Sequence, residues 1–240
     1  MSMEKMNQLK QDALSFGISL SDEQLKQFYN YYEMLIEWNE KINLTAITEF
    51  DEVLKKHFLD SLSIGRILKQ NSSVSILDIG TGAGFPGIPI KIAFPNTEIT
   101  LMDSLNKRVK FLNEVIDTLG LDKIKAIHGR AEDFAKKGML RENFDICVSR
   151  AVANLSSLSE FCLPYVKVGG KFISYKSEKA MDELELSQNA ISILGGGNVN
   201  SDTFVLTGTD FSRTLLCIEK INETPNKYPR KAGTPVKQPL

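Results

Sequence analysis

Hydrophobic positions follow two different rules along this chain of 240 residues. Up to residue 70 the apolar side chains recur at spacings of three and four, which is typical of amphipathic helices, and no alternating run predicts a strand. We expect helices at 4–16, from a cap at Ser21 to about Asn39, and from Thr48 onward. The second helix is expected to bury the stripe Leu25, Phe28, Tyr29, Tyr32 and Ile36.

From residue 73 the pattern changes to short apolar strands that alternate with helices. Strands are expected at 73–79, 97–103, 123–129, 144–150, 171–175, 198–206 and 213–221, and helices at 86–94, 106–120, 131–137, 154–166 and 178–194. This alternation predicts an α/β fold with a doubly wound, mostly parallel sheet. We therefore divide the chain into an N-terminal helical region (1–72), an α/β domain (73–223) and a C-terminal tail (224–240).

Composition narrows the class of protein. The net charge is −1 and 42% of the residues are apolar, as in ordinary globular proteins. No apolar run reaches the ~20 residues that span a bilayer, and the polar N-terminus lacks the core of a signal peptide, so we expect a cytoplasmic protein without a membrane partner. Three separated cysteines are expected to be reduced core thiols, and with two histidines a metal site is not expected.

The last seventeen residues have a composition of their own. After Glu223 the chain has no acidic residue but four basic ones and four prolines. This composition favours an extended arm without a core of its own. Such an arm is either merely solvated or contacts phosphates, and charge alone does not decide between the two. The basic residues in question are Lys227, Arg230, Lys231 and Lys237.

The segment 74–89 is a candidate ligand cradle, with the sequence VSILDIGTGAGFPGIP. An apolar strand ends near Asp78, glycines follow at positions 80, 82 and 84, and a helix begins behind them. Glycine admits positive φ and close approach of a ligand to the main chain, and the helix N-terminus offers free N–H groups. The G-x-G-x-x-G fingerprint of dinucleotide binding requires a glycine where Phe85 stands, and no Gly-Lys-Ser/Thr follows for a P-loop.

An acid at Asp78 is unfavourable beside a pyrophosphate, but it suits a ligand with an ammonium group and no phosphate. S-adenosylmethionine is such a ligand. Backbone N–H groups of the turn Gly80–Gly82–Gly84 can approach its head group and ribose. Asp103, at the next strand end, can accept hydrogen bonds from the ribose hydroxyls, or it only caps the following helix, which Ser104 can also do. After the third strand, residues 130–133 lie where adenine is expected. A backbone amide of Ala131 or Glu132 and an acid, Glu132 or Asp133, can hydrogen-bond its edge.

The residues at the end of the fourth expected strand indicate the class of methyl acceptor. The segment SRAVA (149–153) has no Asn/Asp-Pro-Pro-aromatic turn for an exocyclic amine, no adjacent cysteine nucleophile for pyrimidine C5 and no Lys-Asp-Lys set for a ribose hydroxyl. A ring nitrogen such as guanine N7 remains, since it needs little activation. Arg150 can orient the base through guanine O6 or a phosphate, form an ion pair with Asp78 or Glu132, or do both. Lys176 either contacts RNA or is a solvated strand end.

Seven blocks of the chain resemble the glucose-inhibited division protein B family, whose members are bacterial 16S rRNA guanine-N7 methyltransferases. They cover nearly the whole chain in the family order. The blocks are EWNEKINLTAIT (37–48), HFLDSL (57–62), DIGTGAGFPGIP (78–89), DSLNKRVKFL (103–112), GRAED (129–133), SRAVA (149–153) and YPRKAGTP (228–235).

This resemblance implies a class I S-adenosylmethionine-dependent methyltransferase fold, a target guanine in the 530 loop of 16S rRNA, and RNA contact by the basic tail. The family has no agreed general base, and we assign none; we also expect no metal and no obligate protein partner. His57 and Asn39 have either an RNA-facing or a structural role. A non-catalytic ribosome-assembly factor and a small-molecule methyltransferase remain the competing hypotheses. The donor contacts that the resemblance implies are Gly80, Phe85, Asp103, Ser104, Leu105, Ala131, Glu132 and Arg150.

Overall fold

The N-terminal region is helical, as its spacing predicted. The structure, a computed structural model, describes residues 2–240. A capping box starts α2, because Ser21 Oγ accepts from Gln24 N at 3.2 Å and Gln24 Oε1 accepts from Ser21 N at 2.8 Å. The helical elements are α1 (Ser2–Leu14), α2 (Asp22–Ile42), α3 (Phe50–Val53), a π-helical turn (Leu54–Leu59), α4 (Asp60–Leu62) and a 3-10 turn (Ser63–Arg66).

The buried stripe of α2 differs from the expected one. Leu25 and Phe28 are buried, but the stripe continues through Tyr31 and Leu35, whereas Tyr29, Tyr32 and Ile36 are only partly buried. Both stripes have helical spacing, and the tertiary partner decides between them. The ring of Tyr31 stacks on Phe58 with centroids 5.4 Å apart, so the following helical segment selects this side of α2.

The remaining chain forms the expected doubly wound sheet. Its order is β3-β2-β1-β4-β5-β7-β6, with β1 to β5 parallel and β7 antiparallel to both neighbours. The order reverses between β1 and β4, which is where such sheets bind ligands. The strands are β1 (Ser75–Ile79), β2 (Glu98–Asp103), β3 (Ile124–His128), β4 (Phe144–Arg150), β5 (Val166–Lys176), β6 (Gly196–Val205) and β7 (Ser212–Lys220).

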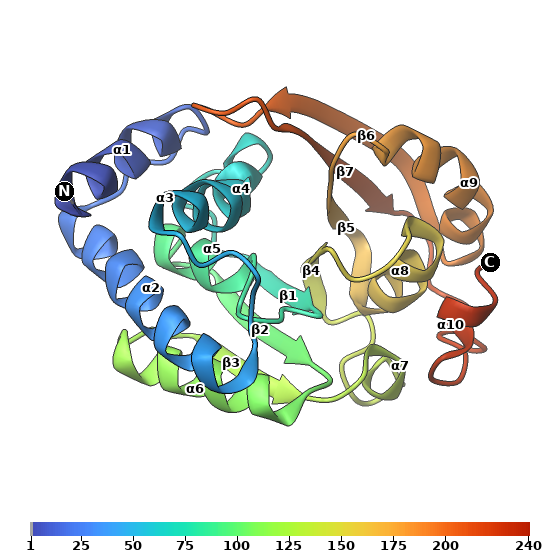
Figure 1. Ribbon diagram of the computed structural model, residues 1–240. Helices are drawn as coiled ribbons and strands as arrows, with labels where there is room; N and C mark the ends of the chain where they lie inside the picture. The colour runs from blue at the N-terminus through green and yellow to red at the C-terminus, as the bar shows by residue number, and fades with distance from the viewer. Residues whose placement is uncertain (1) are drawn as a thin grey trace.

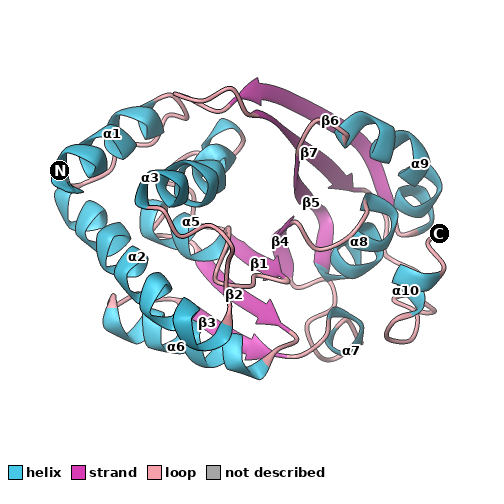
Figure 2. Ribbon diagram, in the orientation of Figure 1, coloured by secondary structure: helices cyan, strands magenta, loops and turns pink. Residues whose placement is uncertain are grey.

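Helices cover both faces of this sheet (Figures 1 and 2). On one face α5 and α6 pack on the sheet and α2 lies across both of them, while α8 and α9 cover the other face. One continuous core joins the N-terminal helices to α5 and α6, and a second lies beneath α8 and α9. The helices of this part are α5 (Gly87–Ala93), α6 (Asn106–Thr118), α7 (Ala131–Phe134), α8 (Leu155–Cys162), α9 (Ala180–Ile193) and α10 (Thr234–Lys237).

Residues 224–240 do not form the extended arm that their composition favoured. Tyr228 is buried, and the short helix α10 lies against α8 (Figure 1). Arg230 supplies the physical reason, because its guanidinium and backbone N–H all bond to the buried carboxylate of Glu160. The tail therefore packs against the α/β domain and shares its core.

All three cysteines are free and buried, as expected. Within the described part of the chain, no helix is long and apolar enough to cross a membrane.

Candidate functional site: two cavities at the strand ends

The glycine turn after β1 is shaped by one close contact. Gly80 has φ +69°, and a Cβ at this position would lie 2.5 Å from Cγ2 of Val152 in the loop after β4. Both the left-handed backbone and the contact therefore require glycine. The Gly80 N–H donates to the Met102 carbonyl of β2 at 2.9 Å, which ties the turn to the neighbouring strand end.

A cavity of about 270 Å³ opens beside this turn, at the carboxyl ends of β1, β2 and β3. We call it the donor cavity. Ile79, Met102 and other apolar side chains line it, and its polar lining residues include Asp103, Arg130 and Glu132. Five residues expected to bind the donor line it: Gly80, Asp103, Ser104, Ala131 and Glu132.

Asp103 is the most constrained of these residues. Only 3% of it is exposed, and its Oδ1 accepts from Leu105 N at 2.8 Å while its Oδ2 accepts from Gly82 N at 2.9 Å. Oδ2 also accepts from Arg108 Nη1 at 3.4 Å, so Oδ1 is the oxygen that keeps a lone pair for a hydroxyl proton. The expectation that Ser104 caps α6 is wrong, because the N-cap residue is Leu105, whose own side chain makes no capping hydrogen bond.

Asp78 lies behind the turn and is not among the residues that line the donor cavity. It is fully buried, and its Oδ2 accepts from Thr81 Oγ1 at 2.6 Å and from Gly87 N at 2.8 Å. Burial raises its pKa from 3.8 to about 7, although these two hydrogen bonds act in the opposite direction. Through these hydrogen bonds the Asp78 side chain links the glycine turn to the first residue of α5.

The other expected donor contacts also lie outside the donor cavity. The Gly82 N–H supports Asp103, and Gly84 packs against Tyr31 and Ile88 of the helical layer. Leu105 is 43% exposed at the start of α6. Five of the expected donor residues therefore line the donor cavity. The expected residues that do not line it are Asp78, Gly82, Gly84, Phe85, Leu105 and Arg150.

A second cavity, of about 410 Å³, lies on the other side of the loop 151–153. We call it the acceptor cavity. Val152 lines the donor cavity, whereas Ala151 and Ala153 line the acceptor cavity, so this loop borders both cavities. Ala151 has φ +55°, an uncommon value for a residue with a side chain. Arg150 and Lys176 belong to this second cavity.

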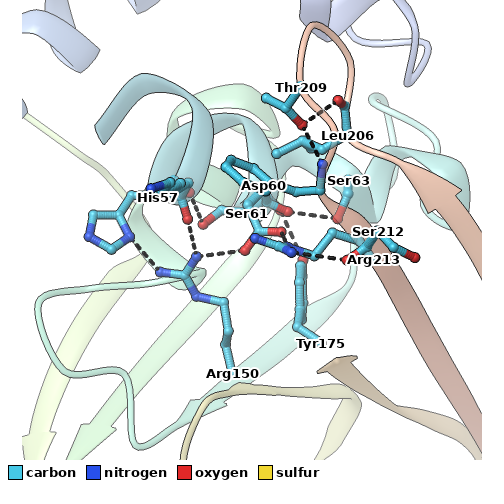
Figure 3. Close-up of polar contacts among 12 residues, drawn as sticks. His57, Asp60, Ser61, Ser63, Arg150, Tyr175, Leu206, Thr209, Ser212 and Arg213 are labelled. Carbon is cyan, nitrogen blue, oxygen red and sulfur yellow. Dashed lines mark hydrogen bonds and ion pairs between the residues drawn. The ribbon is translucent and has the colours of Figure 1, made fainter. Parts of the chain in front are cut away.

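A cationic cluster forms one wall of the acceptor cavity (Figure 3). Arg150 Nη1 donates to Asp60 Oδ2 at 2.7 Å, and Arg213 Nε donates to Asp60 Oδ1 at 2.8 Å. The expected ion pair of Arg150 with Asp78 or Glu132 is therefore wrong. Asp60 is a closer partner because the π-helical turn and α4 bring it over the end of β4. One buried carboxylate thus orients two guanidinium groups.

His57 completes this wall. Its ring stacks on Phe85 with centroids 4.4 Å apart, its Nδ1 lies 3.2 Å from Arg150 Nη2, and its Nε2 lies 2.9 Å from Thr45 Oγ1. Burial, and next the positive charge of Arg150, lower its pKa from 6.5 to about 3. His57 is therefore neutral at physiological pH, and both ring nitrogens are engaged.

Asn39 has a structural role in holding the segment that reaches this wall. Its Oδ1 accepts from Leu44 N at 2.7 Å and from Thr45 N at 2.8 Å, beyond the end of α2. These contacts fix the turn that carries Thr45, the hydrogen-bond partner of His57.

The residues expected to contact RNA divide into two groups. Lys176 Nζ lies 2.7 Å from Glu183 Oε2 and is 10% exposed, and Arg230 is paired with Glu160. Lys227, Lys231 and Lys237 are exposed, with Lys227 placed over the ring of Tyr228. Three cations are thus accessible on the folded tail.

Sequence reasoning missed several cavity residues. Asp60 and Arg213 were not singled out, although Asp60 lies in the HFLDSL block. Phe161, Gly233 and Val236 line the donor cavity from α8 and the tail. Of these three residues, only Gly233 lies in a block that resembles the family, YPRKAGTP. Within the described residues, no group of three or more His, Cys, Asp or Glu could hold a metal ion.

The fold resembles those of solved methyltransferase structures. A methyltransferase from Aquifex aeolicus, titled SAM-dependent, has a TM-score of 0.51 at 15% identity and covers 70% of this chain and 92% of its own. TYW2 from M. jannaschii, solved in complex with AdoMet, has a TM-score of 0.56 at 14% identity over 73% of this chain and 80% of its own. At these identities the likeness concerns the fold alone, which is the expected class I methyltransferase fold.

Sequence comparison is more specific. Ribosomal RNA small subunit methyltransferase G of Lachnoclostridium phytofermentans is 57% identical over 226 residues, which cover 94% of this chain and 93% of that protein. The protein of the same name from Clostridium perfringens strain 13 is 49% identical over 99% of this chain and 100% of its own. The family model GidB, described as rRNA small subunit methyltransferase G, matches residues 24–210. The chain therefore belongs to the GidB family and is an S-adenosylmethionine-dependent methyltransferase.

Proposed function

We propose that the protein transfers a methyl group from S-adenosylmethionine to N7 of a guanine in the 530 loop of bacterial 16S rRNA. The observation that carries this proposal is the pair of cavities on the two sides of loop 151–153. One has the polar groups that suit a nucleoside donor without phosphate, and the other has a cationic wall that suits an RNA nucleotide. Family membership supplies rRNA as the substrate class.

The donor is assigned to the first cavity because its residues match the parts of the molecule. Gly80 leaves bare main chain for the amino-acid head, and Asp103 accepts from the ribose hydroxyls. The main chain of Ala131 and the carboxylate of Glu132 lie at the end of β3, where they can hydrogen-bond the adenine edge. When bound, the donor supplies an electrophilic sulfonium methyl and leaves as S-adenosylhomocysteine.

The target guanine is assigned to the acceptor cavity. Asp60 holds Arg150 and Arg213 in fixed orientations. Other N–H groups of the two guanidinium groups bond to the Lys56 carbonyl, His57 and the Ser212 carbonyl. The N–H groups that remain can donate to guanine O6 or to a phosphate. Such contacts orient the base and hold its ring nitrogen in line with the methyl group. Positioning at a reactive distance is the main contribution that this transfer requires of the protein.

No general base is assigned, and N7 needs none. The N7 lone pair is free in neutral guanine, so no proton has to leave before attack. His57 cannot serve as an imidazolium acid, because its pKa of about 3 leaves it neutral. We assign it the role of holding Arg150 and Phe85 in place.

RNA outside the target nucleotide is assigned to the exposed cations of the tail. Lys227, Lys231 and Lys237 are free to approach phosphates, and Lys176 lies inside the acceptor cavity beside Glu183. Phosphate contacts of this kind position an RNA without reading its sequence. The small ribosomal subunit, or its RNA, is therefore the partner that we propose.

The proposal is tested by incubating the protein with donor labelled on its methyl group and with small-subunit RNA from cells that lack this activity. Label is expected in the RNA. Label only in protein or in small metabolites contradicts the proposal, and donor binding without any transfer favours a non-catalytic assembly factor instead.

A further inference from the structure

The C-terminal segment 228–238, which we call the strap, borders the donor cavity. Gly233 and Val236 line this cavity, together with Phe161 of α8. The strap ends in α10, which lies beside α8 in Figure 1. A segment whose composition favoured an arm in solvent therefore supplies one wall of the site that is assigned to the donor.

Buried contacts hold the strap against α8. Glu160 is fully buried, and its two carboxylate oxygens accept from Arg230 N at 2.6 Å and from Arg230 Nη2 at 2.6 Å. Ser157 Oγ, one turn earlier on α8, donates to the Pro235 carbonyl at 2.7 Å. Because these contacts attach both ends of the strap to one helix, the position of Gly233 and Val236 depends on α8.

The strap also contacts a polar residue of the donor cavity directly. Gly233 N donates to Glu132 Oε1 at 3.0 Å. This bond occupies one oxygen of the carboxylate that is assigned to adenine and fixes its orientation. The strap therefore lies at the adenine side of the cavity, and the Val236 and Phe161 side chains give this side an apolar edge.

We propose that the strap is part of the donor-binding site. Gly233 and Val236 form the wall that covers the adenine moiety, and Arg230 is a positioning residue that keeps this wall in place through Glu160. The proposal rests on the assignment of the donor to this cavity. It also gives Arg230 a role in donor binding that is separate from the RNA contacts of its exposed neighbours.

The first test measures the affinity of the full-length protein for S-adenosylhomocysteine by calorimetry. Val236 is 57% exposed, so Val236→Ser is expected to preserve folding yet weaken binding severalfold, whereas Val168→Ser, at a 53% exposed valine on β5, is the matched control and is expected to leave binding unchanged. Arg230→Leu is expected to weaken binding by about tenfold or more, whereas Arg66→Leu, which breaks a guanidinium–carboxylate pair with Asp202 outside both cavities, is expected to leave it within about twofold. Wild-type affinity in both Val236→Ser and Arg230→Leu overturns the proposal.

The second test uses the unaltered protein and does not depend on whether a variant folds. Saturating S-adenosylhomocysteine is expected to slow amide hydrogen exchange severalfold in peptides that span the strap. Unchanged exchange in the strap, with protection elsewhere in the cavity, overturns the proposal. The variant Asp103→Asn separates the assignment of the cavity from that of the strap. If Asp103→Asn and the strap variants all keep wild-type affinity, the donor cavity itself is wrongly assigned. If Asp103→Asn abolishes binding and the strap variants do not weaken it, only the role of the strap is wrong.

Discussion

Asp60, from the N-terminal helical region, forms an ion pair with Arg150 at the end of β4, and Asp60 Oδ2 lies 2.7 Å from Arg150 Nη1. Only 6% of the Asp60 side chain and 14% of the Arg150 side chain are exposed. The other Asp60 oxygen holds Arg213 of β7. The N-terminal helices are therefore part of the acceptor cavity, because they supply a carboxylate that orients both guanidinium groups.

Asp60→Asn tests this relationship. The amide keeps the size of the side chain but leaves two neighbouring guanidinium groups without their counter-charge. We expect methyl transfer to fall at least tenfold while donor affinity is retained, and stability to drop by roughly 3 kcal/mol. Kinetics, calorimetry and urea unfolding measure the three effects. Asp202→Asn, which breaks the more exposed pair with Arg66, is the control and is expected to leave transfer intact.

Gly80→Ala tests the close contact between the glycine turn and the loop after β4. The added Cβ would lie 2.5 Å from Val152 Cγ2 at a φ of +69°, so we expect lower stability and weaker donor binding. Gly138→Ala, at φ +81° with open space around it, reports the cost of backbone strain alone, about 1 kcal/mol. The double variant Gly80→Ala/Val152→Ala should recover part of the donor affinity. No recovery would mean that the clash does not cause the loss.

Asp78→Asn tests the buried carboxylate behind the turn. The pKa of Asp78 is raised from 3.8 to about 7, so between these values the folded chain binds more protons than the unfolded chain. The stability that this group contributes is therefore fully present below pH 3.8 and is lost as the pH rises through about 7. Urea unfolding should show that the difference in unfolding free energy between the variant and wild type shifts in favour of the variant from pH 5 to pH 8. A constant difference would contradict the buried, raised pKa.

Lys227, Lys231 and Lys237 are expected to contact phosphates. Replacing all three with Gln should weaken RNA binding about equally for different sequences and reduce the slope of log affinity against log salt by roughly 2. Filter binding at several salt concentrations measures this slope, and donor affinity should not change. An unchanged slope would show that the tail does not contact phosphates.

The sequence carried enough information to predict the sheet and much of the donor cavity. Each strand end could be located from local periodicity, and in a parallel sheet these ends converge, so Asp103, Ala131 and Glu132 were expected to meet beside Gly80. The exchange of Tyr29 and Tyr32 for Tyr31 in the core could not be predicted, because both stripes have helical spacing and Phe58 decides between them.

The acceptor cavity and the strap depend on contacts between distant parts of the chain. Asp78 and Glu132 were the expected partners of Arg150, and local pattern does not show that the π-helical turn brings Asp60 closer. The tail has the composition of a solvated arm, and a single buried carboxylate, Glu160, changes its structure. These pairs join residues that are far apart in the sequence, so neither local propensity nor composition predicts them.

The most direct test of the account is the position of the methyl group in the RNA. Small-subunit RNA from cells that lack this activity, after reaction with the purified protein and donor, is treated with borohydride and aniline, which cleave the chain at N7-methylguanine. We predict one new cleavage site, in the 530 loop, that disappears in the Asp103→Ala variant. Labelled RNA without any such cleavage, or cleavage only outside this loop, would contradict the account.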